Sequence, residues 1–258
     1  MKNNIFKYFI LLLSLIVILV LYLSTVGIKT DKFNDQIKKK ISQINQNIDI
    51  NLKKIKLTID PLRLKIYAKT VGTTVYFSKR SLELESIKTQ VSLSSLIKNN
   101  ISSSKIEIKT KSLLLNDLIK FIQTTNNKPE LFILDKIVKK GHVIIDLSLN
   151  IDENGKIEND YKIEGLIKDA SVNILNKTNF NNINFNFNFQ KDDYFFNEIN
   201  FKAEEVKFIS KKLNVKKKKN SFIIDAIVEN DQSSLNSNLL KLLNLGFENI
   251  IIDDAKLK

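Results

Sequence analysis

An alternation of apolar and polar residues runs through most of this chain and limits its fold more than any other feature. The clearest stretch is INFNFNF, in which asparagines alternate with Ile183, Phe185, Phe187 and Phe189. Successive side chains of a β-strand point to opposite faces, so this stretch predicts a strand with one apolar and one polar face. The apolar face has to be covered, either by other protein or by something that is not protein.

The same alternation recurs over residues 48–110 and 142–228, in short runs separated by turn residues. These lengths and spacings predict about ten to twelve antiparallel strands joined as a meander. We therefore expect a mainly β fold with a few helices (α+β), built on one long sheet with an apolar face. Such a sheet gives a closed sandwich or barrel if it folds on itself, and an open apolar groove if it curls without closing.

Two hairpins have distinct signals. Asn154-Gly155 is the strongest short hairpin signal in the chain. KLNVKKKKNSFIIDAIV predicts a second hairpin, with Phe222 and Ile224 alternating along its second strand and Lys216 to Lys219 at its tip. We interpret the lysine tip as a solvated turn, and contact with an anionic membrane surface is the alternative.

Amphipathic helices are predicted at four places. TDKFNDQIKKKISQINQNI can be capped by Thr30 or Asp31 and is expected either to pack on the end of the sheet or to lie near anionic headgroups. Its apolar side is formed by Phe33, Ile37, Ile41, Ile44 and Ile48. SLLLNDLIKFI starts at a possible Ser112 cap, and KPELFILDKIVKKG has Pro129 near its start and Gly141 just past its end. SSLNSNLLKLLNLG follows later, before a last strand in ENIIIDDAKLK.

Residues 8–28 carry no charge. As a helix they are about 30 Å long, which matches the core of a bilayer. The residues we assign to this membrane anchor are Phe9, Leu13, Ile16, Leu19 and Leu23. A cleavable signal peptide is the alternative, but its apolar run is shorter and ends at small residues, whereas no alanine occurs here before Ala68. We therefore favour an uncleaved anchor.

The short leader before this span indicates the topology. A leader of a few residues is most easily kept in the cytoplasm, so the rest of the chain is expected across the membrane, which in a bacterium is the periplasm. We divide the chain into a leader and anchor at residues 1–29 and a periplasmic β domain at residues 30–258. Because the chain stops directly after a predicted strand, a complete protein and the N-terminal piece of a longer one both stay open.

Composition argues against catalysis and against specific nucleic-acid binding. The net charge of +13 favours anionic partners, but only two of the 41 basic residues are Arg, which reads bases and phosphates bidentately. The chain has no cysteine and a single histidine, His142, so thiolate and zinc sites are excluded. The adjacent carboxylates Asp192-Asp193 and Asp253-Asp254 point apart on a strand. We predict no enzyme, no cofactor and no metal.

The order of these elements resembles that of a known family. An anchor and an amphipathic helix precede IDINLKKIKLTIDPLRLKIYA, and GHVIIDLSLNIDENGKIENDYKIEGLIKDASVNIL follows later. Together they resemble the AsmA-like superfamily (AsmA, TamB and YhdP), and most of all the N-terminal part of YhdP-type proteins. The resemblance covers nearly the whole chain and rests on architecture and a loose strand pattern, without a catalytic signature.

This resemblance implies an inner-membrane protein with a periplasmic β-groove. The groove would shield phospholipid tails on their way between the two membranes, and the protein would contribute to outer-membrane biogenesis. It implies no catalytic residue. The candidate groove residues are Ile183, Phe185, Phe187, Phe189, Phe222 and Ile224. Phospholipids, the inner membrane and a further envelope protein are the expected partners.

Two other functions stay open on the sequence. The first is an anchored assembly or structural factor with a closed β-core, which binds an envelope protein through a sheet edge. The second is a polyanion-binding protein that uses its lysines, although the anchor and the scarcity of Arg argue against it.

Overall fold

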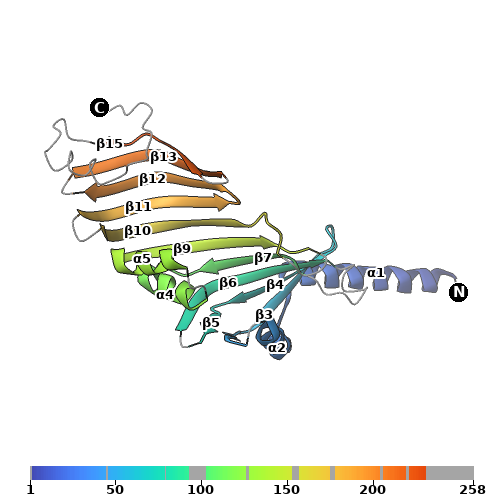
Figure 1. Ribbon diagram of the computed structural model, residues 1–258. Helices are drawn as coiled ribbons and strands as arrows, with labels where there is room; N and C mark the ends of the chain where they lie inside the picture. The colour runs from blue at the N-terminus through green and yellow to red at the C-terminus, as the bar shows by residue number, and fades with distance from the viewer. Residues whose placement is uncertain are drawn as a thin grey trace. The chain divides into compact units, whose positions relative to one another are not determined.

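The computed structural model describes residues 2–44, 46–78, 80–92, 103–125, 128–152, 157–174, 178–203, 206–218 and 221–230. The chain divides into two compact units, which are described one after the other (Figure 1). Unit 1 comprises Met1–Lys109 and Ser148–Asn159, and unit 2 comprises Thr110–Leu147 and Asp160–Lys258. The predicted hairpin at Asn154-Gly155, Lys219, Asp253-Asp254 and the last predicted helix and strand lie outside the described residues.

Helix α1 (Lys2–Thr25) opens unit 1. Its segment Phe6–Thr25 is long and apolar enough to cross a membrane, although a signal sequence would meet the same criteria. The predicted anchor residues lie in this segment: Phe9, Leu13, Ile16 and Leu19 are exposed, and Leu23 is half-buried. The N-terminal apolar helix is thus confirmed.

The predicted end of the apolar helix at residue 28 is wrong by three residues. The N–H groups of Val26 and Gly27 both donate to the Tyr22 carbonyl oxygen, at 2.9 and 3.0 Å. Gly27 has a φ of 71°, which a glycine adopts readily and which ends the helix. A Cβ at Gly27 would lie 2.2 Å from the Leu57 carbonyl oxygen, so the chain passes directly from the helix onto a strand.

Unit 1 contains an antiparallel sheet. Its strands pair in the order β1 (Ile28–Thr30), β3 (Ile55–Asp60), β4 (Lys65–Val71), β6 (Arg80–Ser92) and β7 (Ser103–Thr110). A smaller ladder of β2 (Ile48–Asn51) and β5 (Thr74–Phe77) pairs with the first part of β6. Long β6 therefore belongs to both ladders, because it pairs with β5 up to Glu83 and with β4 from Ser86 onward.

Directly opposite residues of an antiparallel pair share a face, so the register assigns the faces of this sheet. Ile55, Leu57 and Ile59 oppose Thr70, Ala68 and Ile66, which gives an apolar face. The other face is charged. Lys88 lies 3.5 Å from the Glu107 carboxylate and 5.0 Å from the centre of the Tyr67 ring.

The Glu107 carboxylate provides a pH test of this charged face. Its hydrogen bond with Lys105 lowers the pKa of Glu107, and the nearby charge of Lys88 acts in the same direction. A carboxyl with a lowered pKa stabilises the fold above its unfolded pKa, and this contribution is lost as the pH falls through the folded pKa. We expect Lys105→Met to raise the pKa of Glu107, which carboxyl-carbon NMR titration would detect. An unchanged pKa in this variant would contradict the assignment.

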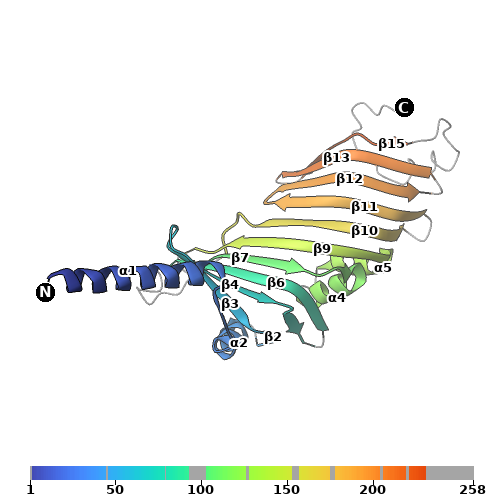
Figure 2. The same cartoon turned by 180° about the vertical axis from the view of Figure 1, so that it is seen from behind.

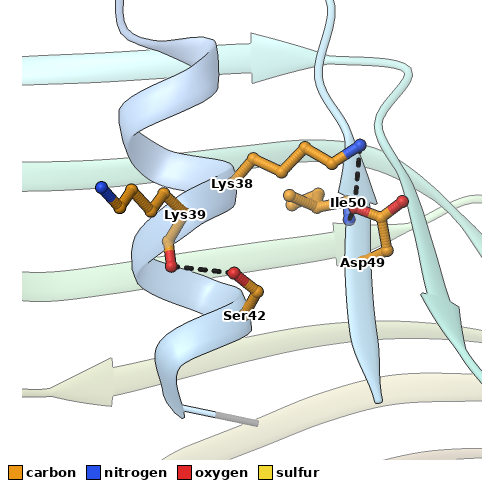
Figure 3. A network of polar contacts seen from close by, with 5 residues as sticks. All are labelled: Lys38, Lys39, Ser42, Asp49 and Ile50. Atoms are coloured by element: carbon orange, nitrogen blue, oxygen red, sulfur yellow. Dashed lines mark hydrogen bonds and ion pairs between the residues drawn. The ribbon is translucent and has the colours of Figure 1, made fainter. Parts of the chain in front are cut away.

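Helix α2 (Asn34–Ile44) lies along β2. The side-chain amide of Asn34 donates to the carbonyl oxygens of Leu52 and Lys53, at 3.2 and 3.1 Å. Lys38 reaches across to the carboxylate of Asp49 at 3.1 Å (Figure 3). The predicted start of the helix at Thr30 or Asp31 is wrong, because Thr30 belongs to β1 and pairs with Ile55. Ile48 lies in β2 opposite Phe77, so it is not part of the helix.

Unit 2 is dominated by a second antiparallel meander. Its strands pair in sequence order: β9 (Val138–Asn150), β10 (Lys162–Ile174), β11 (Thr178–Gln190), β12 (Asp193–Ala203), β13 (Val206–Lys218) and β14 (Ser221–Ala226). Two short strands extend it, β8 (Leu113–Leu114) on β9 and β15 (Glu229–Asn230) on β13. Strands β10 to β13 lie side by side (Figure 1). Strand β14 pairs with β13 and ends the order of the described strands. The prediction of a mainly β chain with a large unclosed antiparallel sheet is confirmed.

Helices α4 (Leu115–Thr125) and α5 (Pro129–Ile137) pack against each other before β9. The Gln123 side chain donates to the Leu131 carbonyl oxygen at 2.9 Å, and the Asn116 side chain donates to that of Val138 at 3.3 Å. The predicted helix start at Ser112 is wrong, because Leu113 and Leu114 pair with β9 instead.

Gly141 and the lysine tip also differ from prediction. Helix α5 ends at Ile137, and Gly141 lies inside β9 rather than just past a helix end. Lys216 to Lys218 are residues of β13 that pair with β14, so they do not form the hairpin tip. The local rule that glycine follows a helix is overridden here by a long-range contact: a Cβ at Gly141 would lie 2.8 Å from the Ala170 Cβ.

Replacing Gly141 by alanine should lower the stability of unit 2. Gly141 has a φ of 144° and Gly72 a φ of 67°, so alanine is strained at both positions, by about 1–3 kcal/mol. The two positions differ in what the new methyl group would contact. At Gly141 it would lie 2.9 Å from the backbone Cα of Ala170, whereas at Gly72 it would meet the flexible Lys53 side chain. We expect Gly141→Ala to cost about 1–3 kcal/mol more than Gly72→Ala in denaturant unfolding. Equal costs would contradict this close approach.

Candidate functional site: an aromatic sheet face in unit 2

The register of β10 and β11 places the predicted groove residues of β11 on one face. Phe189, Phe187, Phe185 and Ile183 oppose Ile163, Gly165, Ile167 and Ala170 in that order. Opposite residues share a face, so this side of both strands carries no charged side chain at these positions. The asparagines between the aromatic residues point to the other side.

A row of β-bulges keeps this face apolar along the whole length of the strands. The register shifts by one residue between Ile167 and Ala170 of β10, and again in β11 and β12. Asp169, Asn182 and Glu198 have φ values of 51°, 51° and 53° at these shifts. Each bulge places two successive polar residues on the same side, so the apolar residues on both sides of it keep one face.

The face continues across β12 to β14. Phe196 and Tyr194 oppose Phe187 and Phe189, and further along Ala203 opposes Phe180. In β13, the residues that oppose this side of β12 are Val206, Phe208, Ser210, Leu213 and Val215. In β14, Ile224 opposes Val215 and Phe222 opposes Lys217. All six predicted groove residues therefore lie on one side of the sheet, which we call the aromatic face.

Ring contacts connect the aromatic residues of this face. Phe189 lies 5.0 Å from Phe187, 5.3 Å from Tyr194 and 5.5 Å from Phe196, measured between ring centroids. A second group joins Phe201 to Phe180 at 5.9 Å and to Phe208 at 5.1 Å. Two of these pairs are stacked, Phe187–Phe189 and Phe201–Phe208, and the others are tilted or edge-to-face. Such pairs stabilise a structure beyond their buried area.

The middle of the aromatic face is buried, whereas its β14 edge is exposed. Phe187 is only 7% exposed, and its ring occupies the space above Gly165, where a Cβ would lie 2.4 Å from it. Phe222 and Ile224 are 61% and 58% exposed. The face thus has a well-packed middle and an accessible edge.

The opposite side of the sheet, which we call the asparagine face, is held by side-chain hydrogen bonds between strands. The Asn188 amide donates to the Glu164 carboxylate at 2.9 Å, and the Asn184 amide donates to Asn200 Oδ1 at 3.0 Å. The Asn186 amide donates to the Glu198 carboxylate at 2.7 Å. Some apolar residues also lie on this face: Phe195 opposes Asn188 and Asn214, and Leu166 opposes Asn186.

Other features of the described residues offer little chemistry. His142 lines a cavity of about 290 Å³ together with Lys168 and Asp169. A polar cavity of about 470 Å³ lies beside the Lys38–Asp49 ion pair in unit 1. In the part of the chain that the structure describes, no group of three His, Cys, Asp or Glu side chains is arranged to hold a metal ion.

Sequence reasoning missed several members of the aromatic face. Phe180, Phe196, Phe201 and Phe208 belong to it, but strict alternation does not connect them with Phe187. The signal that would have found them is an apolar pair separated by two polar residues, as in FNNI at 180–183 and FNEI at 196–199. Such a spacing marks a bulge between two alternating runs.

Comparison with known proteins gives no match: no family model, no curated protein and no solved structure matches the chain. The geometry of the aromatic face therefore carries the functional argument.

Phe187 and Phe222 should separate the packed and accessible parts of this face. We expect Phe187→Ala to lower the free energy of unfolding by about 3–5 kcal/mol, because it empties a packed position between rings. The matched variant Phe222→Ala should change it by less than about 0.5 kcal/mol, because its side chain is mostly exposed. Denaturant unfolding of the full chain, followed by circular dichroism, would measure both. Similar losses of unfolding free energy in the two variants would contradict the difference in packing between Phe187 and Phe222.

Proposed function

We propose that this protein is an AsmA-like, inner-membrane-anchored protein that shields phospholipid acyl chains on the aromatic face during transport between membranes. The observation that supports it is the continuity of this face across β10 to β14, ending in exposed Phe222 and Ile224. Acyl chains have the chemistry that such a face can cover, since each methylene removed from water contributes roughly 0.8 kcal/mol.

The edge of the aromatic face also offers cationic groups. Lys217 of β13 opposes Phe222 of β14, and Lys216 and Lys218 are the neighbours of Lys217 along β13. All three lysines are exposed. A phospholipid lying with its tails against Phe222 and Ile224 could place its phosphate near these ammonium groups. The amphipathic character of the ligand then matches that of this end of the face.

Helix α1 supports the membrane part of the proposal. It is long and apolar enough to cross a bilayer once, and the strand β1 follows it after two residues. We propose that the leader is cytoplasmic and that the two units are periplasmic. In this location the protein would take part in outer-membrane biogenesis.

An assembly factor that binds an envelope protein is the second candidate, and one observation favours it. Among the described strands, β14 ends the hydrogen-bonded order and is exposed on both sides, with Ile223 of the asparagine face 46% exposed. An exposed apolar edge strand can pair with a strand of another protein.

A photocrosslinking pair distinguishes these functions. A benzophenone amino acid at Phe189 reports on the aromatic face, and the same residue at Phe195 reports on the asparagine face; both side chains are half-buried. After irradiation in a Gram-negative host, we expect phospholipid adducts of the full chain at position 189 and none at position 195. Intact-protein mass spectrometry would identify them.

Protein adducts at position 189 without lipid adducts would reverse the ranking and favour the assembly factor. Lipid adducts at both positions would show contact without face selectivity and would overturn the proposed role of the aromatic face.

Charged substitutions at the accessible edge give a second test. Phe222→Asp with Ile224→Asp should weaken lipid capture at least about tenfold, because two apolar contacts are lost and two charges must be desolvated. The matched control is Ile223→Asp, which lies between them on the opposite face and is similarly exposed. Adduct yield at position 189 would measure the effect, and equal losses in both variants would argue against a role for this face.

A further inference from the structure

The turn between β3 and β4 in unit 1 exposes two leucines. Pro61, Leu62, Arg63 and Leu64 are all exposed, and the side chain of Leu62 is 95% exposed. Leu64 is 62% exposed. An isolated exposed leucine is ordinary on a protein surface, but two in one tight turn form an apolar tip that packing does not explain.

The turn itself is well defined. Asp60 and Lys65 form the last pair of the ladder, and the Arg63 N–H donates to the Asp60 carboxylate at 3.0 Å. Leu64 has a φ of 51°, a left-handed conformation that Gly or Asn adopts at lower cost than leucine. Turn chemistry alone would therefore favour a small or polar residue here.

The position of this turn relates it to the membrane helix. Ile28, the third residue after α1, opposes Leu57 of β3. Because β3 is antiparallel to β1, its residues after Leu57 run back alongside the end of α1, and α1 contacts β3. Figures 1 and 2 both show the β3–β4 turn beside the end of α1 nearest the sheet.

The segment from Leu57 of β3 to Pro61 is long enough to bring the β3–β4 turn to the end of the apolar helix. Three residues separate Leu57 from Pro61, which is about 10–13 Å of strand. The same distance corresponds to about seven to nine residues of α-helix. Counted back from Ile28 past Gly27 and Val26, which are not helical, the turn lies at the level of the last turn of α1, which contains Tyr22 of the apolar segment.

We propose that the turn Pro61–Leu64 inserts into the bilayer leaflet at the C-terminal end of α1, as a second membrane contact of unit 1. Leu62 and Leu64 enter the interface, while Arg63 and neighbouring Lys65 reach the lipid phosphates with their long side chains. The inference rests on the part of the proposed function in which α1 crosses a membrane, and it does not depend on lipid transport.

A second contact has a mechanical consequence. A single helix leaves the attached domain free to rotate about the helix axis and to tilt. Two contacts, joined through the β1–β3 ladder, hold unit 1 at a defined orientation to the bilayer surface. The turn thus acts as a positioning element and not as a further anchor.

Site-specific fluorescence can test the insertion in the full chain. The protein contains no cysteine, so each single-cysteine variant carries one label. We would attach an environment-sensitive NBD label at Leu62→Cys and reconstitute the full chain in vesicles of phosphatidylethanolamine and phosphatidylglycerol. Val71→Cys is the matched control, because Val71 is 56% exposed and lies at the far end of β4, about 20 Å away. Leu19→Cys reports on α1.

We expect blue-shifted emission and strong quenching by nitroxide-labelled lipids at positions 62 and 19, and neither effect at position 71. A water-like signal at 62 with a lipid-like signal at 19 would overturn the inference while the anchor stands. Water-like signals at both 62 and 19 would overturn the anchor and the inference together. Equal quenching at 62 and 71 would show that the whole unit lies on lipid, which also contradicts a specific insertion of the turn.

Discussion

The row of bulges across β10, β11 and β12 is the constraint on which the sheet of unit 2 depends. Strands of 11 to 13 residues twist, and a one-residue slip exchanges the two faces. Here each slip is matched in the neighbouring strand, so Ile167 and Ala170 in β10 and Phe180 and Ile183 in β11 share one face. Asp169 and Asn182 suit the left-handed backbone at the bulges better than most residues do. The Asp169 N–H is further held by Asn184 Oδ1 at 2.9 Å.

The two faces of this sheet are stabilised by different interactions, which explains its unusual composition. Asparagine offers both donors and an acceptor, so the asparagine face can connect successive strands without strong charge. Ser171 with Asn181 and Asn173 with Asn179 repeat this arrangement, at 2.7 and 2.6 Å. The aromatic face holds the same strands through ring contacts. The sheet can therefore hold its strands together without a fully buried core on the aromatic side.

The period-2 pattern was enough to predict the mainly β fold and to bring Ile183, Phe185, Phe187 and Phe189 together, because a strand leaves little freedom in where a side chain points. It failed where a long-range contact decided the outcome. Leu113 and Leu114 pair with β9 instead of starting a helix, and Gly141 is required by Ala170 and not by a helix end. Lys216 to Lys218 extend β13 because β14 offers partners. No local rule contains these partners, and a bulge hides Phe180 from strict alternation.

A sheet that holds an apolar ligand has to satisfy two opposed requirements. Its apolar residues must be packed well enough to keep the strands in register, and some must stay accessible enough to exchange protein contacts for ligand contacts. In this chain the requirements fall on different residues of one face. Phe187, against Gly165 and between Phe185 and Phe189, contributes to folding, whereas Phe222 and Ile224 have few protein contacts to lose. Because ring contacts link the middle of the face across strands, charge placed at the β14 edge is expected to leave the register intact, so variants at this edge test the proposed ligand binding separately from folding.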